Sequence, residues 1–117
     1  MVIQADFEKM VDFSSNIVPT RIAFGSCRKQ WMPDSIFKHV TEYSPELWIW
    51  LGDAYYTSPK QYMEGKGADP LSIESLMNAK NKSLESPLYQ EMVSALKFPV
   101  LGTYDDHDRG VNGKFLL

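Results

Sequence analysis

The chain has 117 residues, of which 44% are hydrophobic and 23% are charged, and its net charge is −3. This composition excludes a disordered tail and is typical of a soluble domain that can bury a core. No run of Lys or Arg forms a basic stripe, so the charge pattern predicts no nucleic-acid partner. The first twenty residues contain no continuous apolar stretch, so they predict neither a secretory signal nor a membrane span. The single cysteine, Cys27, excludes an internal disulfide and leaves the compartment open.

The first half of the chain predicts one βαβ unit. A short apolar strand covers residues 21–26, and Asp34 is in position to cap a helix over residues 34–43. This helix ends before Pro45, because the residue before a proline avoids helical geometry. A second strand covers residues 47–51. A helix between two strands favours a parallel pair with a right-handed crossover.

The second half predicts another unit of the same kind. A polar loop over residues 57–69 leads to a helix over residues 70–83, and Ser86 caps a further helix over residues 87–96. A strand over residues 99–103 closes the unit. The first of these two helices carries apolar residues at helical spacing, which predict a buried face: Ile73, Leu76, Met77 and Leu84.

The run from Leu47 to Leu51 is uninterrupted and bulky, which predicts a strand buried on both faces. Asp53 follows this strand after a single glycine. It therefore stands at the carboxyl edge of the sheet, where open α/β sheets bind their ligands. Taken alone, Asp53 is equally consistent with a capping or loop acid. Its place after a buried strand favours a metal ligand.

The stretch from Asp105 to Asp108 reads Asp-Asp-His-Asp and follows the last predicted strand. Three carboxylates in four residues repel one another, and burying them is costly unless a cation compensates. The alternative is a solvated turn that caps a neighbouring element. Two strands that deliver acids to one edge favour a metal site there. An EF-hand loop starting at Asp106 is excluded, because Val111 stands where glycine is required and Leu117 where glutamate is required.

Two further side chains are candidate metal ligands, Cys27 and Tyr56. Cys27 also follows a strand at this edge, and a thiolate suits a soft or redox-active metal, although a lone cysteine is usually a small buried hydrophobe. Tyr56 lies three residues after Asp53, and a phenol beside a trivalent ion can ionise and coordinate it, although most tyrosines simply pack. His39 stands among charged residues on a helix and is predicted to be a surface residue.

Together these motifs resemble the alkaline phosphatase D (PhoD-like) metallophosphatases. The resemblance covers residues 20–112, with the motifs in matching order and spacing. It implies an α/β fold that is part of a calcineurin-like metallophosphoesterase fold, with parallel βαβ units and helices flanking a sheet. The residues that carry it are Phe24 to Cys27, Leu47 to Tyr56, Pro99 to Asp108, Gly110 and Asn112.

The resemblance implies a hydrolase of phosphomonoesters and phosphodiesters that uses a metal-activated water. It implies Fe³⁺ with Ca²⁺ as the metals, or other divalent metals in their place. By motif match, Cys27, Asp53 and Tyr56 would hold the iron, and Asp53 would bridge the two ions. Asp106 corresponds to a metal-ligand asparagine of the wider superfamily. His107 would face the substrate and stabilise the phosphoryl transition state.

The sequence departs from this family in two places. The family usually continues Asn-Asp-Gly/Ala-Gly, whereas Asn112 is followed directly by Gly113. The second half of the family's domain, with further ligands and a second sheet, is not among these residues. Residues 21–117 are therefore expected to be the N-terminal portion of such a domain, after a lead-in over residues 1–20, and to have little or no turnover alone. The alternative function is a non-catalytic fragment that binds metal or associates with another chain through its incomplete sheet.

Overall fold

The computed structural model describes residues 18–57 and 73–109. Most of the predicted lead-in, most of the polar loop and the motif residues Gly110 and Asn112 lie outside this range. The elements in chain order are β1 (Ile22–Gly25), α2 (Ile36–Tyr43), β2 (Leu47–Trp50), α4 (Ile73–Leu84), α5 (Pro87–Ala95), β3 (Leu101–Gly102) and the short 3₁₀ helix η1 (His107–Arg109).

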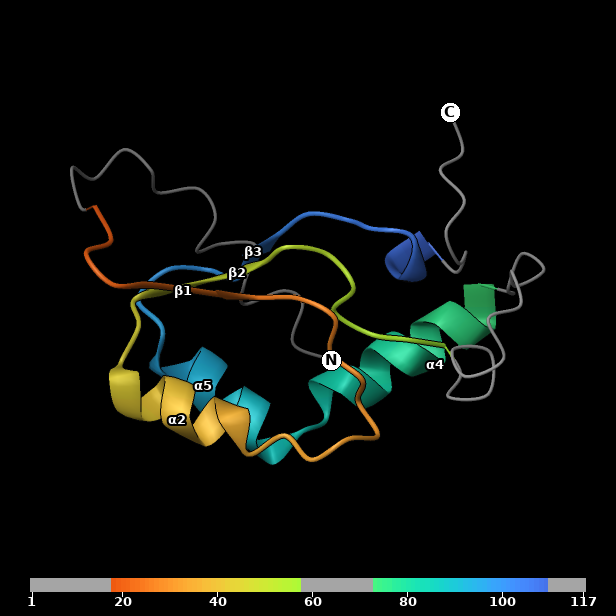
Figure 1. Ribbon diagram of the computed structural model, residues 1–117, viewed down its shortest axis with the longest axis horizontal. Helices are drawn as coiled ribbons and strands as arrows, with labels where there is room; N and C mark the ends of the chain where they lie inside the picture. The colour runs from red at the N-terminus through yellow and green to blue at the C-terminus, as the bar shows by residue number, and fades with distance from the viewer. Residues whose placement is uncertain (1–17, 58–72, 110–117) are drawn as a thin grey trace.

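The three strands form one parallel sheet in the order β1-β2-β3, with β2 at its centre (Figure 1). Residue Gly25 of β1 lies opposite Trp50 of β2, and Trp50 lies opposite Gly102 of β3. The α/β class, the parallel pairing and the three strand positions are therefore confirmed. All three strands are shorter than predicted, and β3 differs most, with two residues in place of five.

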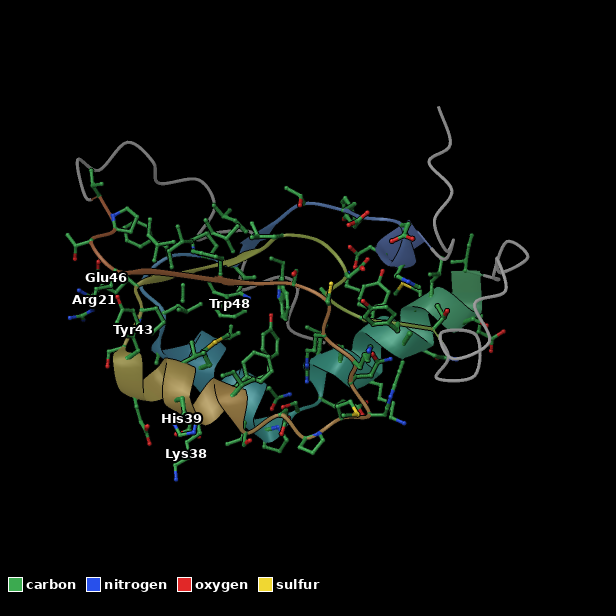
Figure 2. All side chains as sticks on the ribbon, viewed as in Figure 1. Arg21, Lys38, His39, Tyr43, Glu46 and Trp48 are labelled. Carbon is green, nitrogen blue, oxygen red and sulfur yellow. The ribbon has the colours of Figure 1, made fainter. Side chains whose placement is uncertain are left out.

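Helices α2 and α5 cover the same face of the sheet (Figure 1), and the core lies between them and the strands. Trp48 points to this side (Figure 2) and packs edge-on against Phe37 of α2, with ring centroids 6.0 Å apart. The indole N–H of Trp50 donates a hydrogen bond to the Tyr89 hydroxyl at 3.1 Å. Gly25 makes room for this layer, since a Cβ there would lie 2.9 Å from the Trp48 ring. Met92 and Leu96 complete the buried cluster.

The opposite face of the sheet is open at β1 and just beyond the end of β2. Ile22 is 45% exposed, Phe24 is 67% exposed, and Leu51, just beyond β2, is 51% exposed. Side chains alternate along a strand, so those that do not point towards α2 and α5 face the other way. Within β2, both tryptophans point to the helix side. On the other face Leu47 is 7% exposed and Ile49 is half-buried, so the predicted burial on both faces holds for Leu47 and in part for Ile49.

Helix α4 does not bury the apolar face that its sequence predicts. Ile73 is 80% exposed, and Met77 and Leu84 are also exposed, whereas Ala79 and Ser83 are buried. The hydroxyl of Ser83 donates to the carbonyl of Ala54 at 3.1 Å, so polar contacts near the end of α4 fix which side faces the loop after β2. Apolar spacing alone therefore gives the wrong face for this helix.

Two of the three predicted helix ends are confirmed. Ser44 ends α2 in the left-handed region, directly before Pro45, and the hydroxyl of Ser86 caps α5 by accepting from the Tyr89 N–H at 3.2 Å. The prediction that Asp34 caps α2 is wrong. The cap residue is Ser35, which makes no side-chain capping bond. The Asp34 carboxylate accepts a hydrogen bond from Ser86 instead of capping α2.

The amino end of the sheet is held by Glu46, whose side chain lies near the start of β1 (Figure 2). Its carboxylate accepts from Lys97 Nζ at 2.6 Å and from the Thr20 hydroxyl at 2.9 Å. The bond from Lys97, followed by those from Thr20, lowers the pKa of Glu46 to about 2. His39 points away from the sheet (Figure 2), as predicted for a surface residue. In the described ranges no helix is long and apolar enough to cross a membrane.

Candidate metal centre

Residues from three separate motifs meet at the carboxyl edge of the sheet. Cys27 follows β1, Asp53 follows β2, and Asp106 and His107 follow β3, so parallel pairing brings all three loops to one edge. One ligand atom from each of Asp53, Asp106 and His107 lies within 4.8 Å of the other two. The Cys27 Sγ lies 3.9 Å from Asp53 Oδ2. The predicted convergence at this edge is therefore confirmed.

Asp53 is the centre of this cluster and is only 6% exposed. Its Oδ2 accepts a hydrogen bond from the Tyr56 hydroxyl at 3.1 Å, and its Oδ1 accepts from the backbone N–H of His107 at 3.3 Å. Burial raises the pKa of Asp53, and the nearby carboxylates of Asp106 and Asp105 raise it further, whereas Tyr56 and His107 oppose the shift. A buried acid whose ionised form is disfavoured is characteristic of functional sites.

The loops at this edge are in close backbone contact. Gly52 has φ +100°, and a Cβ at this position would lie 2.6 Å from the Cβ of Asp105, so only glycine permits the approach. The N–H of Arg28 donates to the Asp53 carbonyl at 2.9 Å, which joins the loops after β1 and β2. Cys27 and Asp53 both have positive φ, at 56° and 52°. Such conformations are costly for non-glycine residues and cluster at functional sites.

Asp108 has a structural role that differs from that of Asp53. Its carboxylate accepts hydrogen bonds from three backbone amides: Asp53 at 2.7 Å, Asp105 at 3.0 Å and Ala54 at 3.0 Å. This acid is 7% exposed and is compensated by the backbone. The capping interpretation of the acidic motif therefore holds for Asp108. Asp53 and Asp106 keep the metal interpretation.

Tyr56 is buried beside both Asp53 and His107. Its ring centroid lies 4.3 Å from that of His107. Burial raises the pKa of Tyr56, and the contacts with Cys27 and Asp53 raise it further, so the phenol keeps its proton and donates to Asp53. Coordination by Tyr56 therefore requires loss of this proton. A ring nitrogen of His107 lies within 4.8 Å of the ligand atoms of Asp53 and Asp106, so the geometry also allows His107 to bind a metal.

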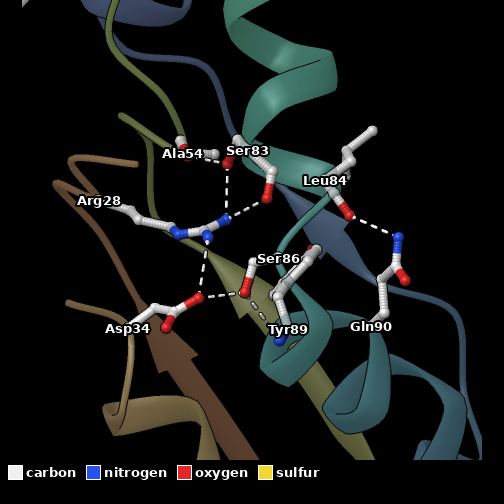
Figure 3. A network of polar contacts seen from close by, with 8 residues as sticks. All are labelled: Arg28, Asp34, Ala54, Ser83, Leu84, Ser86, Tyr89 and Gln90. Atoms are coloured by element: carbon white, nitrogen blue, oxygen red, sulfur yellow. Dashed lines mark hydrogen bonds and ion pairs between the residues drawn. The ribbon is translucent and has the colours of Figure 1, made fainter. Parts of the chain in front are cut away.

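Nothing in the sequence indicated a half-buried cation, Arg28, whose contacts are drawn in Figure 3. Arg28 Nη1 donates to the carbonyl of Ser83 at 2.6 Å and to its hydroxyl at 2.7 Å, and Nη2 lies 3.9 Å from Asp34 Oδ2. The guanidinium also lies over the rings of Phe37 and Tyr89, at 4.9 Å and 5.2 Å from their centroids. Burial lowers the pKa of Arg28, and Asp34 opposes this shift.

The Arg28 network anchors the residues that carry the cluster. Ser83 binds Arg28 and also the carbonyl of Ala54, so α4 holds the loops after β1 and β2 together (Figure 3). Arg28 follows Cys27 directly, and Ala54 follows Asp53. Ser83, which accepts both hydrogen bonds from Arg28, is 55 residues away in the sequence, so no local spacing marks this pair.

Five side chains at this edge carry groups that could hold a metal ion. These groups are the carboxylates of Asp53 and Asp106, the imidazole of His107, the thiol of Cys27 and the phenol of Tyr56. Iron accepts such a mixture, whereas Ca²⁺ takes oxygen ligands only.

Comparison of the chain with family models, curated proteins and solved structures found no match.

Proposed function

We propose that this chain supplies a metal centre of a phosphoric ester hydrolase, a phosphomonoesterase or phosphodiesterase of the PhoD-like type. The observation that carries the proposal is that ligand atoms of Asp53, Asp106 and His107 lie within 4.8 Å of one another. The thiol of Cys27 and the hydroxyl of Tyr56 both contact Asp53 Oδ2. These residues come from three motifs up to 80 positions apart, from Cys27 to His107. The metal and the ester class rest on the motif resemblance.

In this proposal Cys27, Asp53, Tyr56 and Asp106 hold Fe³⁺. A bound ion of this kind polarises a phosphoryl oxygen and lowers the pKa of a water molecule. Asp53 fixes the position of the site, because its two carboxylate oxygens already bind Tyr56 and the backbone of His107. The imidazole of His107 stabilises charge that develops on the ester, or protonates the leaving oxygen.

The described residues contain one cluster with metal-binding geometry. A two-metal hydrolase needs a second ligand set that holds another ion roughly 3.5–4 Å from the first. Ca²⁺ is the second ion that the resemblance suggests. We therefore expect the 117-residue chain to bind one ion and to show little or no turnover, whereas an enzyme that includes the second ligand set turns over.

The test measures bound metal and the hydrolysis of bis(p-nitrophenyl) phosphate in a protein that includes the second ligand set. Asp53→Asn is expected to lose both metal and activity. His107→Ala is expected to keep the metal and to lose activity by about 10²- to 10⁴-fold, as for removal of a general acid or charge-stabilising group. Normal metal content and normal rate in Asp53→Asn would contradict the proposal. Loss of metal in His107→Ala would place His107 among the ligands.

A second candidate function is association with another protein through the open face of the sheet. The observation that favours it is the exposure of Ile22 and Phe24, which lie two positions apart in β1 and therefore on the same face of the sheet. Sedimentation of the purified chain separates the candidates, since association predicts oligomers that disperse in Phe24→Glu. A monomer that binds metal supports the metal centre alone.

A further inference from the structure

We infer that Gln30 is a positioning residue of the metal centre and acts through Tyr56; this inference rests on the proposed function. The side-chain amide of Gln30 pairs with both polar groups of the Tyr56 backbone. The Tyr56 N–H donates to Gln30 Oε1 at 3.0 Å, and Gln30 Nε2 donates to the Tyr56 carbonyl. The two bonds together fix the orientation of the amide, because each of its atoms meets the complementary group.

Tyr56 needs these two bonds because of where it lies. Residues 51–57 are in neither helix nor strand, yet Tyr56 is only 3% exposed. Buried backbone N–H and C=O groups require partners, and a segment without regular structure has no ladder to supply them. Gln30 supplies both partners from the loop after β1, in the way that a neighbouring strand would. Gln30 therefore fixes the position of the Tyr56 backbone relative to the loop after β1.

The position of Tyr56 in turn controls two groups of the metal centre. Its hydroxyl donates to Asp53 Oδ2, and its ring lies 4.3 Å from His107. Trp31, the residue after Gln30, packs edge-on against the Tyr56 ring, with centroids 6.1 Å apart. Displacement of the Tyr56 backbone would move the phenol away from the carboxylate and from the imidazole together.

The loop that carries Gln30 also carries Cys27, three residues earlier. Cys27 reaches Asp53 Oδ2 directly, at 3.9 Å, whereas Gln30 reaches the same oxygen through the Tyr56 hydroxyl. Between Cys27 and Gln30, the backbone N–H of Arg28 donates to the Asp53 carbonyl, and its side chain donates to the Ser83 hydroxyl. The loop after β1 thus positions both groups that contact Asp53 Oδ2. It carries the thiol of Cys27 itself, and its Gln30 positions the phenol of Tyr56.

The first test uses nuclear magnetic resonance of the metal-free 117-residue chain. The chain has two histidines, and the ring current of Tyr56 shifts the imidazole protons of His107 but not those of His39 on α2. In Gln30→Ala the His107 resonances should move towards the values of an exposed histidine, while His39 stays unchanged. Gln90→Ala is the matched control, because Gln90 also donates one side-chain bond to a backbone carbonyl, that of Leu84 at 3.0 Å.

Two further measurements keep the inference falsifiable. Gln30→Met keeps the volume and removes both hydrogen bonds, so it should behave as Gln30→Ala does; wild-type His107 resonances in either folded variant would overturn the inference. In the unmodified chain, hydrogen exchange should show the Tyr56 amide protected. Exchange of that amide at the rate of an open loop would overturn the inference without any substitution.

Metal affinity links Gln30 to function. Titration calorimetry with Co²⁺ should give an affinity about 10- to 100-fold weaker in Gln30→Ala than in the wild-type chain, as is usual for residues that orient ligands. An unchanged Co²⁺ affinity together with unchanged His107 resonances would remove Gln30 from the site. If the wild-type chain binds no metal, the proposed function fails, and the resonance shift still decides whether Gln30 positions Tyr56.

Discussion

Two neighbouring polar clusters, one around Arg28 and one around Asp53, differ in how their charge is compensated. Arg28 binds the carbonyl and hydroxyl of Ser83, pairs with Asp34 and lies over two aromatic rings. Asp53, within the described part of the chain, accepts from a phenol, a thiol and a backbone amide. The two clusters are joined by the bond from the Arg28 N–H to the Asp53 carbonyl.

The difference separates a structural cluster from a functional one. The Arg28 network places a cation among acceptors, including an anion, so folding satisfies it internally. At Asp53 further carboxylates stand close by, and burial raises the pKa of this acid. The residual negative charge is what a metal ion would neutralise. On this account removing Arg28 destabilises the fold, whereas removing the charge of Asp53 stabilises the metal-free fold.

The largest effect is expected for Arg28→Ala. This substitution leaves Asp34 without its cation and exposes the carbonyl and hydroxyl of Ser83 to the cavity that forms. We expect the free energy of unfolding to fall by about 2–4 kcal/mol, measured by urea denaturation. Lys38→Ala, an exposed cation on α2, is the control and should change stability little. Equal stability of the two variants would show that the network is not an anchor.

A smaller loss is expected for Asp108→Asn. The asparagine amide nitrogen cannot accept a hydrogen bond, so part of the set of three backbone amides loses its acceptor. We expect a loss of about 1–3 kcal/mol in the same denaturation experiment. Glu42→Gln, which removes an exposed acid from α2, is the matched control. A loss no greater than in this control would contradict the structural role of Asp108.

The smallest effect is expected at the other end of the sheet and depends on pH. The folded state lowers the pKa of Glu46 from its ordinary 4.5 to about 2. The ionised carboxylate therefore stabilises the fold above pH 4.5, and this contribution is lost as pH falls from 4.5 towards about 2. The free energy of unfolding should fall across this window, and Glu46→Gln should flatten the profile there. A wild-type profile that matches the variant would refute the Lys97 interaction.

Much of the fold could be predicted because its signals are local. Apolar runs bounded by glycine or proline mark the strands, and the Ser86-Pro87 pair marks the start of α5. The strand ends also place Cys27, Asp53 and Asp106 at one edge, because parallel strands share their direction. Local sequence patterns, together with the rule that parallel strands end at the same edge, were therefore enough to predict that these residues converge.

The missed features depend on side chains that are distant in the sequence. Arg28 meets Ser83, and Asp34 meets Ser86, across 55 and 52 residues, and nothing in the local pattern marks either pair. The same contacts turn α4 so that Ser83 is buried and Ile73 is exposed, against the apolar spacing. The division of labour between Asp53 and Asp108 likewise depends on which backbone amides face each carboxylate.

The most direct test of the central claim compares the stability of the wild-type chain and Asp53→Asn with and without Co²⁺. Without metal, Asp53→Asn should be more stable by roughly 0.5–2 kcal/mol, because a buried charge has been removed. With Co²⁺ at a hundredfold excess over its dissociation constant, the wild type should gain about 2.7 kcal/mol and the variant nothing, so the order of stability reverses. A variant that is less stable without metal, or that gains as much from Co²⁺ as the wild type does, would contradict the assignment of Asp53 as the centre of a metal site.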